Sequence, residues 1–404
     1  MQALPSRLAV DALARASVLA VCAAARHPSV DAAHLDLHRI AAAYRSDRQL
    51  TIDGRSPDVW SPLSGFWRSS DGWVRTHANY PHHARALRRA LHLSDDAEAD
   101  ALASALSERS TVDAVTRVTE AGGLAVPVLE EDPAADLALR EHPLVVSEPT
   151  GQAAVRRLAP EPGLAGVRVL DLTRVIAGPV CTRTLALLGA DVLRVDPPGI
   201  PEPGWQHLDT GHAKRSTILH AASARFEELL SAADVIVLGY RPSALDRLGL
   251  SRAALAERHP DLIVAQLSAW GLDHPERRGF DSLVQAESGI ALIESPDGER
   301  PGALPAQALD HSAGYLLAAA ICDAFHDRRT TGVIRTVRTS LRRVAAELLG
   351  MPRTADPEPA APLDPTAHTQ RFRVGAQNVV TVRSAIPGLE FDAPRQWGRD
   401  PATW

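Results

Sequence analysis

Apolar residues recur at helical spacing near the start of the chain. Residues 8–24 and 35–44 place apolar side chains every three or four positions, which predicts two helices. We therefore expect residues 1–59 to form a helical segment. Much later, an Ala-rich run from Ser312 to about Asp327 predicts one long helix.

Residues 60–150 mix short strand patterns with helices. Residues 65–74 predict two strands around the turn at Ser70, Asp71 and Gly72. Helices are expected over 81–93, where Pro81 suits the first position, and over 95–106 and 112–121. Gly122 and Gly123 end the last helix, and residues 124–129 form an apolar strand. This pattern indicates a small α+β domain.

From Val167 onward, apolar strands alternate with helices. The strand candidates are residues 167–172, 191–195, 216–219, 235–238 and 262–267. Such alternation predicts a mostly parallel sheet with helices on both faces, and ligands of such sheets bind outside the carboxyl ends of the strands. A Pro/Gly-rich linker over 160–166 precedes this α/β domain of residues 160–350. Residues 351–404 read as a Pro-rich linker and an irregular tail.

The composition argues against several classes of function. The 404 residues carry 43 Lys and Arg against 49 Asp and Glu, a net charge of −6, so nucleic acid is not an expected partner. Cys22, Cys181 and Cys322 lie far apart without a CxxC spacing, which argues against a zinc site or disulfides and suits the cytoplasm. The apolar run of residues 8–25 contains Asp11 and Arg15, so we expect neither a signal peptide nor a membrane span.

The histidines offer no recognisable metal site. His34 and His38 are spaced one helical turn apart, and His82 and His83 are adjacent, but no third ligand is placed by spacing. We expect these histidines to be solvated. A GxGxxG fingerprint is also missing, so a nicotinamide cofactor has no support in the sequence.

The beginning of the chain echoes a later segment. Asp11 precedes the Ala-rich residues 12–25, just as Asp310 precedes residues 312–324. Each helix is followed by a β-like stretch and a further helix, within 32–48 and 332–349 respectively. Ala-rich helices match one another easily by chance, but the shared order of elements favours repetition.

A set of motifs follows in fixed order along the α/β domain: GVRVLDLTRVIAGP at 166–179, LLGADVLRVDPPG at 187–199, KRS at 214–216, ADVIV at 233–237, RP at 241–242 and GFD at 279–281. This set resembles the family III CoA-transferases, the CaiB/BaiF family of formyl-CoA transferases and α-methylacyl-CoA racemases. The resemblance extends over residues 166–349. It implies the fold of that family, in which a Rossmann-like, mostly parallel sheet domain accompanies a smaller α+β domain.

The small domain also resembles this family. The matching segments are DGW at 71–73, AGGLAVPV at 121–128, DP at 132–133 and HP at 142–143. In the family this domain normally follows the large one, whereas here it precedes it. The simplest interpretation joins the latter part of one family copy, beginning with residues 1–59, to the front part of a second. The resemblance implies an interlocked homodimer, although the shuffled order alternatively lets one chain close the ring alone.

Asp310 matches the family's catalytic aspartate, which stands before an Ala/Gly-rich helix. A carboxylate there can attack an acyl-CoA carbonyl and divide a hard transfer into easier steps. Asp is also a favoured helix N-cap, and both roles are compatible because a helix N-terminus keeps a carboxylate ionised. Asp11 lacks the Gly-rich neighbours and is expected to be vestigial.

The resemblance places CoA near the turn formed by Val175, Ile176 and Ala177. Backbone N–H groups at such a strand-to-helix turn can contact CoA or hold the thioester oxygen, although the turn also serves simply as a tight connection. Some family members carry glutamine where this chain has Ile176. That side chain therefore gives no help to an oxyanion here.

Further CoA contacts follow from the resemblance alone. Arg247 and Arg278 occupy positions that are cationic near CoA in formyl-CoA transferases, and a guanidinium suits phosphate. Tyr240 matches an aromatic position near the adenine. The alternatives are solvated surface arginines and ordinary aromatic packing.

Phe280 and Asp281 separate two subclasses. The racemases place a histidine where Phe280 stands, and phenylalanine cannot accept a proton, so racemisation is disfavoured. Asp281 keeps a carboxylate that the transferases also show nearby, with a structural role as the alternative. Phe280 and Asp281 are expected beside the bound CoA.

The resulting hypothesis is a CoA-transferase of the EC 2.8.3 type. It moves CoA from an acyl-CoA to a small carboxylic acid through an aspartyl covalent intermediate, with CoA as substrate and no permanently bound cofactor or metal. The alternative is a catalytically degenerate family member that retains CoA affinity, which Ile176 favours and Asp310 opposes. An acyl-CoA racemase is a weaker alternative.

Overall fold

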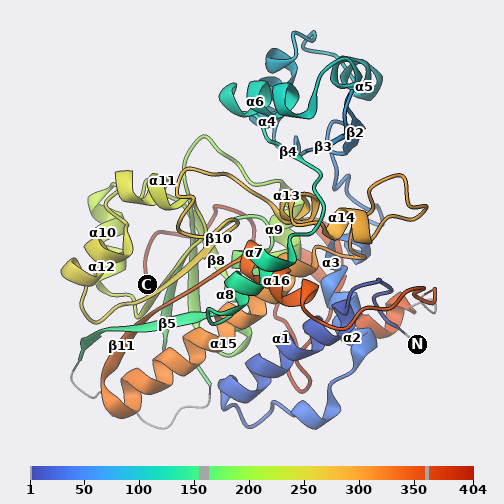
Figure 1. The fold of residues 1–404 in the computed structure, drawn as a ribbon. Helices are drawn as coiled ribbons and strands as arrows, with labels where there is room; N and C mark the ends of the chain where they lie inside the picture. The colour runs from blue at the N-terminus through green and yellow to red at the C-terminus, as the bar shows by residue number, and fades with distance from the viewer. Residues whose placement is uncertain (1, 154–162, 360–363) are drawn as a thin grey trace.

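The large body of the molecule is an α/β sandwich, and a smaller domain projects from it (Figure 1). The computed structural model describes residues 2–153, 163–359 and 364–404. Residues 160–162 of the expected linker and 360–363 of the Pro-rich stretch lie outside the described residues.

The large body is organised around one seven-stranded sheet with the order β5-β11-β10-β9-β6-β7-β8. Strands β6 to β11 are parallel where they pair, and β5 runs antiparallel to β11 at one edge. The expected mostly parallel sheet is therefore confirmed. The strands are β5 (Val146–Gln152), β6 (Arg168–Leu172), β7 (Asp191–Asp196), β8 (Arg215–Ile218), β9 (Val235–Leu238), β10 (Ile263–Ser268) and β11 (Val333–Ser340).

Helices cover both faces of this sheet because its strands are apolar on both sides. Val169 joins the core on one face, whereas Leu170, the next residue, joins the core on the other. The first face packs against α1 (Val10–Ala25), α8 (Ala177–Leu187), α15 (Ala308–Thr331) and α16 (Leu341–Leu349). The second face packs against α10 (Ala224–Ser231), α11 (Pro242–Arg247) and α12 (Arg252–Arg258).

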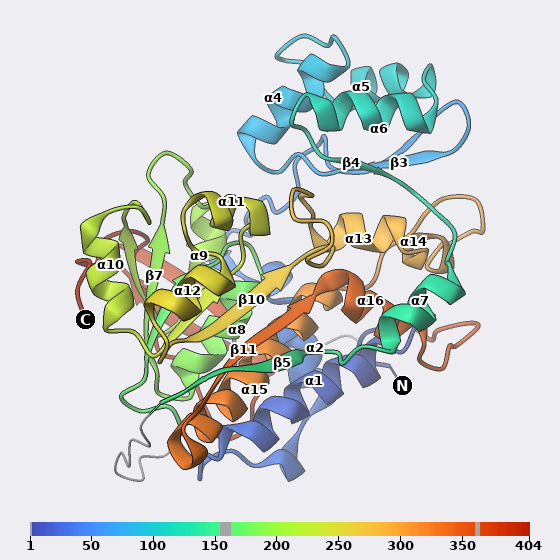
Figure 2. The ribbon, with the colours of Figure 1, turned by 60° about the vertical axis from the view of Figure 1, so that its left-hand side comes forward.

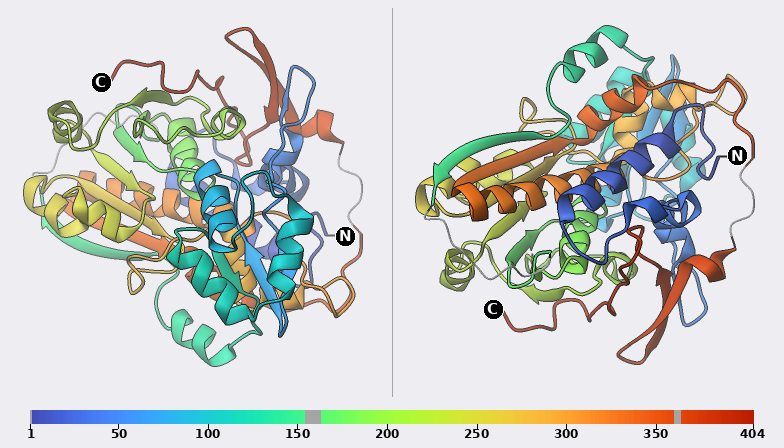
Figure 3. Two further views of the ribbon diagram at one scale, coloured as in Figure 1. Left: turned by 90° about the horizontal axis from the view of Figure 1, so that it is seen from above. Right: turned by 90° about the horizontal axis from the view of Figure 1, so that it is seen from below.

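The two Ala-rich segments that resemble each other in sequence are in contact in the structure. Helix α1 packs alongside α15, as the view from below shows (Figure 3, right). The chain then continues through a 3₁₀ turn (Ala32–His34) into α2 (Leu37–Tyr44) and α3 (Ser46–Gln49). The β-like stretch expected after the first copy is thus wrong, because the described residues 26–36 contain a turn and no strand.

The smaller domain is an antiparallel sheet under three helices (Figure 2). Its order is β2-β3-β4, with β2 (Phe66–Arg68), β3 (Trp73–Thr76) and β4 (Ala125–Pro127). Helices α4 (Pro81–Ala90), α5 (Ala99–Ser107) and α6 (Thr111–Glu120) cover a core that includes Val74, Leu102 and Val118. The chain then returns through α7 (Pro133–Arg140) to β5. Residues 133–150, which the sequence analysis placed in the small domain, therefore belong to the large body, since α7 packs against α16 and β5 pairs with β11.

The tail is more ordered than expected. Strands β12 (Thr369–Val374) and β13 (Gln377–Val382) form a hairpin that pairs with β1 (Thr51–Ile52). Farther on, the backbone N–H of Ser216 in β8 donates to Asp400 over 2.8 Å. The expectation of an irregular tail is wrong for the hairpin, and the last residues cover the β8 edge, which otherwise leaves unpaired backbone groups.

Three short α-helices remain in the described part of the chain. They are α9 (Gly204–Thr210), α13 (Asp281–Glu287) and α14 (Ile290–Ile293). No helix in the described part of the chain has the length and apolar character needed to cross a bilayer.

Candidate functional site

A cavity of about 390 Å³, here called cavity A, opens at the carboxyl ends of the parallel strands. The large body supplies the turns after β6, β9 and β10 and the start of α15, and the small domain supplies the start of α4. The lining side chains that bear on chemistry are Tyr80, His82, His83, Arg174, Val175, Ala177, Tyr240, Arg241, Arg278, Phe280 and Asp310. The cavity thus brings together Val175, Ala177, Tyr240, Arg278, Phe280 and Asp310 from the sequence-based site.

Asp310 lies in the first turn of α15 and is 7% exposed. Among the described residues, no donor forms a hydrogen bond with its carboxylate, whereas its backbone N–H donates to Asp281 over 2.9 Å. Burial and the nearby charge of Asp281 raise the pKa of Asp310 well above its usual range. A buried carboxylate without donors that faces a cavity is poised to react or to bind.

Asp11 has a different environment at the echoed position. Its two oxygens accept hydrogen bonds from the backbone N–H groups of Ala3 and Leu4, each over 2.8 Å. The Asp11 carboxylate therefore holds the turn before α1, and it does not line cavity A.

The close approach of α15 to α8 brings Asp310 to the β6–α8 turn. A Cβ atom on Gly314 would lie 2.5 Å from the carbonyl oxygen of Ala177, so only glycine fits between the two helices. Gly178 is constrained similarly, because a Cβ there would lie 2.3 Å from the Cβ of Thr173.

Asp281 does not line cavity A, but it contacts Asp310 through a hydrogen bond to the backbone. It is fully buried at the start of α13, where it accepts from the Asp310 N–H and from the side-chain amide of Gln285. Burial raises the pKa of Asp281 to about 6, against the lowering effect of these hydrogen bonds and of Arg75. This arrangement favours the structural role, in which Asp281 satisfies the open end of α15.

The turn after β6 carries backbone strain. Val175 has φ of 71°, a conformation that costs a β-branched residue roughly 1–3 kcal/mol. Its N–H donates to Glu202 over 3.1 Å, which holds the turn in place. Val175 and Ala177 line the cavity, whereas Ile176 packs against the hydrophobic core.

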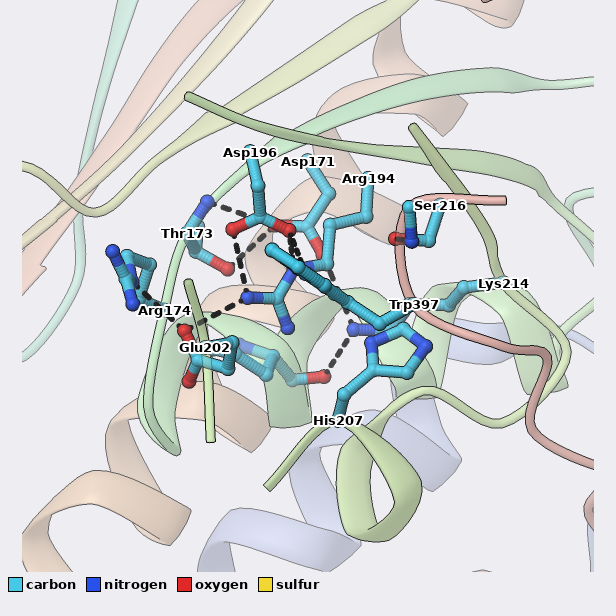
Figure 4. Close-up of polar contacts among 12 residues, drawn as sticks. Asp171, Thr173, Arg174, Arg194, Asp196, Glu202, His207, Lys214, Ser216 and Trp397 are labelled. Atoms are coloured by element: carbon cyan, nitrogen blue, oxygen red, sulfur yellow. Dashed lines mark hydrogen bonds and ion pairs between the residues drawn. The ribbon is translucent and has the colours of Figure 1, made fainter. Parts of the chain in front are cut away.

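Glu202 belongs to a buried ionic network at the ends of β6, β7 and β8 (Figure 4). Its carboxylate accepts from Arg174 over 2.8 Å and from Arg194 over 3.0 Å. Arg194 also binds Asp196 through two hydrogen bonds of 2.8 and 3.0 Å. Trp397 of the tail donates to Asp196 over 2.8 Å, so the tail closes this network.

Lys214 forms the second part of the network. Its ammonium group, fully buried, donates to Asp171 over 3.1 Å, to Thr182 over 2.6 Å and to the carbonyl of Pro179 over 2.9 Å. Burial lowers the pKa of Lys214 to about 8, although the charge of Asp171 opposes the shift. Lys214 thus ties β6 to the first turn of α8.

The arginines predicted to meet CoA are separated in the structure. Arg278 lines cavity A and donates to the carbonyl of Gly122 in the small domain over 2.9 Å. Arg247 is 59% exposed by its side chain, pairs with Glu276 at 3.3 Å and does not line the cavity. Arg174 and Arg241, which the sequence analysis did not propose, do line it.

Two aromatic residues of the predicted site also face cavity A. The buried hydroxyl of Tyr240 has no hydrogen-bond partner among the described residues, so it is free to meet a ligand. Phe280 stacks on His77 with ring centroids 3.8 Å apart. Phe280 offers no proton acceptor at the position that the racemases give to histidine.

Sequence reasoning missed the contribution of the small domain. His83 is buried against the cavity, and burial lowers its pKa to about 3, so its imidazole is neutral. The expectation of a solvated His83 is wrong, whereas His34, His38 and His82 are exposed as expected. Nothing in the sequence links His83 to Asp310, because only the return of the chain from β4 to β5 brings them together. No cluster of His, Cys, Asp and Glu within the described ranges has the geometry of a metal site.

Comparisons with known proteins support one family. Residues 164–380, more than half of the chain, match the model of the CoA-transferase family III. A protein named probable fatty acyl-CoA transferase Rv3272, from Mycobacterium tuberculosis, is 32% identical over 209 residues, which cover 47% of this chain and 53% of the relative. A formyl-CoA:oxalate CoA-transferase of Rhodopseudomonas palustris is 34% identical over 186 residues, with 42% and 44% covered.

A solved structure shares the fold. The orthorhombic crystal form of Rv3272 from M. tuberculosis superposes with a TM-score of 0.50 at 22% identity, covering 58% of this chain and 97% of that one. The chain spans about half the length of the curated relatives that it matches.

Replacing Lys214 by alanine tests the network. Lys214→Ala leaves Asp171 buried without its cation, so we expect a loss of about 3–5 kcal/mol in the free energy of unfolding. Arg117→Ala, which removes a half-exposed pair with Asp113 on α6, should cost about 0.3–0.5 kcal/mol. Denaturant unfolding measures both variants, and equal losses would contradict a structural role for the buried pair.

The buried carboxylates predict a pH dependence of stability. The folded state binds the Asp281 proton more tightly than the unfolded state, so stability falls as pH rises from about 4 to about 6. Asp281→Asn removes this group, so the variant should lose less stability than the wild type across that window. Urea unfolding at several pH values measures the difference, and parallel curves would contradict the raised pKa.

Proposed function

Because the chain belongs to the CoA-transferase family III, we propose that it moves CoA between an acyl-CoA and a free carboxylic acid in cavity A. The observation that carries this proposal is the Asp310 carboxylate. It is buried, lacks a described hydrogen-bond donor and faces a cavity that three arginines, Arg174, Arg241 and Arg278, also line.

The named relatives support an enzyme of the EC 2.8.3 type. They are called a fatty acyl-CoA transferase, a formyl-CoA:oxalate CoA-transferase and a CoA-transferase/lyase. These names support an acyl-CoA and a small carboxylic acid as the substrates of this chain.

The proposed chemistry uses Asp310 as a nucleophile. Its carboxylate oxygen attacks the thioester carbonyl carbon, the C–S bond breaks, and CoA leaves as thiolate from a mixed anhydride. The thiolate then attacks the Asp310 carbonyl, which releases the first acid and leaves an aspartyl-CoA thioester. The second acid reverses both steps, so Asp310 returns as a carboxylate and the new acyl-CoA departs.

The lining of cavity A fits this sequence of steps. Guanidinium groups at Arg241 and Arg278 suit the phosphates of CoA. The Ala177 N–H, in the first turn of α8, is suited to a developing oxyanion. The raised pKa of Asp310 means that an adjacent positive charge or dipole is needed to hold its carboxylate ionised.

The alternative, a family member that binds CoA without transfer, is favoured by Ile176, which packs into the core and leaves the turn without a side-chain amide. The unpaired Asp310 carboxylate opposes it, since a degenerate site has no reason to keep a carboxylate buried without donors.

The interlocked homodimer stays a prediction of the resemblance. Both walls of cavity A come from one chain, because Tyr80 and His83 of the small domain face Asp310 of the same molecule. We therefore propose that a single chain forms a complete site, whether or not two copies associate.

Asp310→Asn should abolish exchange while leaving CoA binding nearly unchanged, because the amide keeps the shape and loses the nucleophile. Incubation of the wild type with acyl-CoA and then hydroxylamine should convert Asp310 to a hydroxamate that peptide mass spectrometry detects. Asp11→Asn serves as the matched control and should keep both exchange and label. Label on Asp11 or Asp281 in place of Asp310 would show that the nucleophile is assigned wrongly.

Arg278→Ala should weaken CoA binding by about tenfold, the expected loss for a charged hydrogen bond to phosphate. Arg247→Ala is the control, and its position outside cavity A predicts little change. Isothermal titration with CoA measures both constants. A larger loss of affinity in Arg247→Ala would indicate that CoA binds at the surface of α11. If the wild type does not bind CoA at millimolar concentration, the proposed site is wrong.

A further inference from the structure

A second cavity of about 400 Å³, here called cavity B, adjoins cavity A. It lies among the linker that leads into the small domain, the segment before α4 and the start of α9. Tyr80 and Val175 line both cavities. His77 of cavity B also stacks on Phe280 of cavity A, so the two spaces share a thin wall of side chains.

The position of this wall ties cavity B to the proposed reaction. Val175 belongs to the turn at which the thioester carbonyl is held, and Phe280 lies in the same cavity as Asp310. An acyl group that extends away from the CoA moiety is directed towards Tyr80 and Val175, the two residues that line both cavities. The arginines remain on the CoA side.

The chemistry of cavity B differs from that of cavity A. Its lining includes Trp60, Trp205, Pro62 and Pro203, and within the described residues it includes no lysine or arginine. Asp58 is the one acidic side chain of this lining, and burial holds the pKa of His77 well below its usual range. A second carboxylate there would meet the acidic Asp58 and no cation of the lining itself, although the guanidinium of Arg75 stacks on Trp60 at 5.4 Å from the ring. An uncharged, apolar group fits.

One polar group in cavity B has no partner. Gln206 is 8% exposed, and its side-chain carbonyl oxygen is buried without a hydrogen bond among the described residues. By contrast, the side-chain oxygen of Asn79, which lines the same cavity, is paired. It accepts hydrogen bonds from the backbone N–H of Ser61 over 3.0 Å and from the hydroxyl of Ser64 over 2.7 Å. Buried acceptors are nearly always paired in folded proteins. The unpaired oxygen of Gln206, a residue of the lining, therefore favours a ligand that donates a hydrogen bond.

We propose that cavity B binds the acyl group of the substrate, and that this group is uncharged, largely apolar and carries a hydroxyl that donates to Gln206. The inference rests on the proposed function. Because the acceptor acid becomes the acyl group of the product in the same place, cavity B selects donor and acceptor alike.

Acceptor acids of matched length test the proposal. With acetyl-CoA as donor, 3-(4-hydroxyphenyl)propionate should have a kcat/KM about tenfold above 3-phenylpropionate, the value of one hydrogen bond, and both should exceed succinate. In Gln206→Leu the preference for the hydroxyl should disappear. Gln377→Leu, an exposed change on β13, is the matched control and should keep it. Trp205→Ala should lower kcat/KM for both aryl acids, because it removes apolar contact.

Binding supplies a readout that does not need catalysis. The neutral analogue 3-(4-hydroxyphenyl)propionamide should bind the wild type in the presence of CoA and bind Gln206→Leu about tenfold more weakly, as calorimetry measures. Succinate as the best acceptor, an unchanged hydroxyl preference in Gln206→Leu, or no binding of the amide would overturn the assignment of cavity B. Binding of the amide without exchange of any acid would overturn the proposed function and leave cavity B as an apolar ligand site.

Discussion

The pairing of buried charges near the carboxyl ends of β6 and β7, together with Lys214 just before β8, is the constraint on which the site depends. Arg194 holds Asp196 and Glu202 together, and Lys214 holds Asp171, all away from water. Buried charges tolerate no displacement of their partners, since an unpaired one costs several kcal/mol. The carboxylate of Glu202 also accepts a hydrogen bond from the Val175 N–H, so the network fixes the strained turn beside Asp310.

Cavity A exists because three remote parts of the chain are held against that turn. Gly314 lets α15 approach α8, and Asp281 accepts the N–H of Asp310 so that the first turn of the helix is satisfied. Arg278 reaches across to the carbonyl of Gly122 and links the small domain to the large body. Asp310, the turn and the small-domain wall are thus positioned by separate contacts.

The contrast between Asp11 and Asp310 shows how environment decides chemistry. Both residues lie at the start of Ala-rich helices that pack side by side. The carboxylate of Asp11 accepts hydrogen bonds from two backbone N–H groups. The carboxylate of Asp310 has no hydrogen-bond donor among the described residues and faces a cavity. The repeated sequence feature therefore gives one structural residue and one candidate nucleophile.

The sequence by itself determined the features that depend on local periodicity and local motifs. Strands that are apolar on both sides and alternate with helices predicted the parallel sheet. The motif after its first strand predicted the turn at Val175, and the family resemblance singled out Asp310 before an Ala-rich helix. Only the tertiary structure decided which distant segments meet: β5 joins the large sheet, the tail hairpin pairs with β1, Arg247 lies outside cavity A, and His83 lies within it. The physical reason is that periodicity records which side of an element is buried, whereas contacts between elements depend on how the chain returns between them.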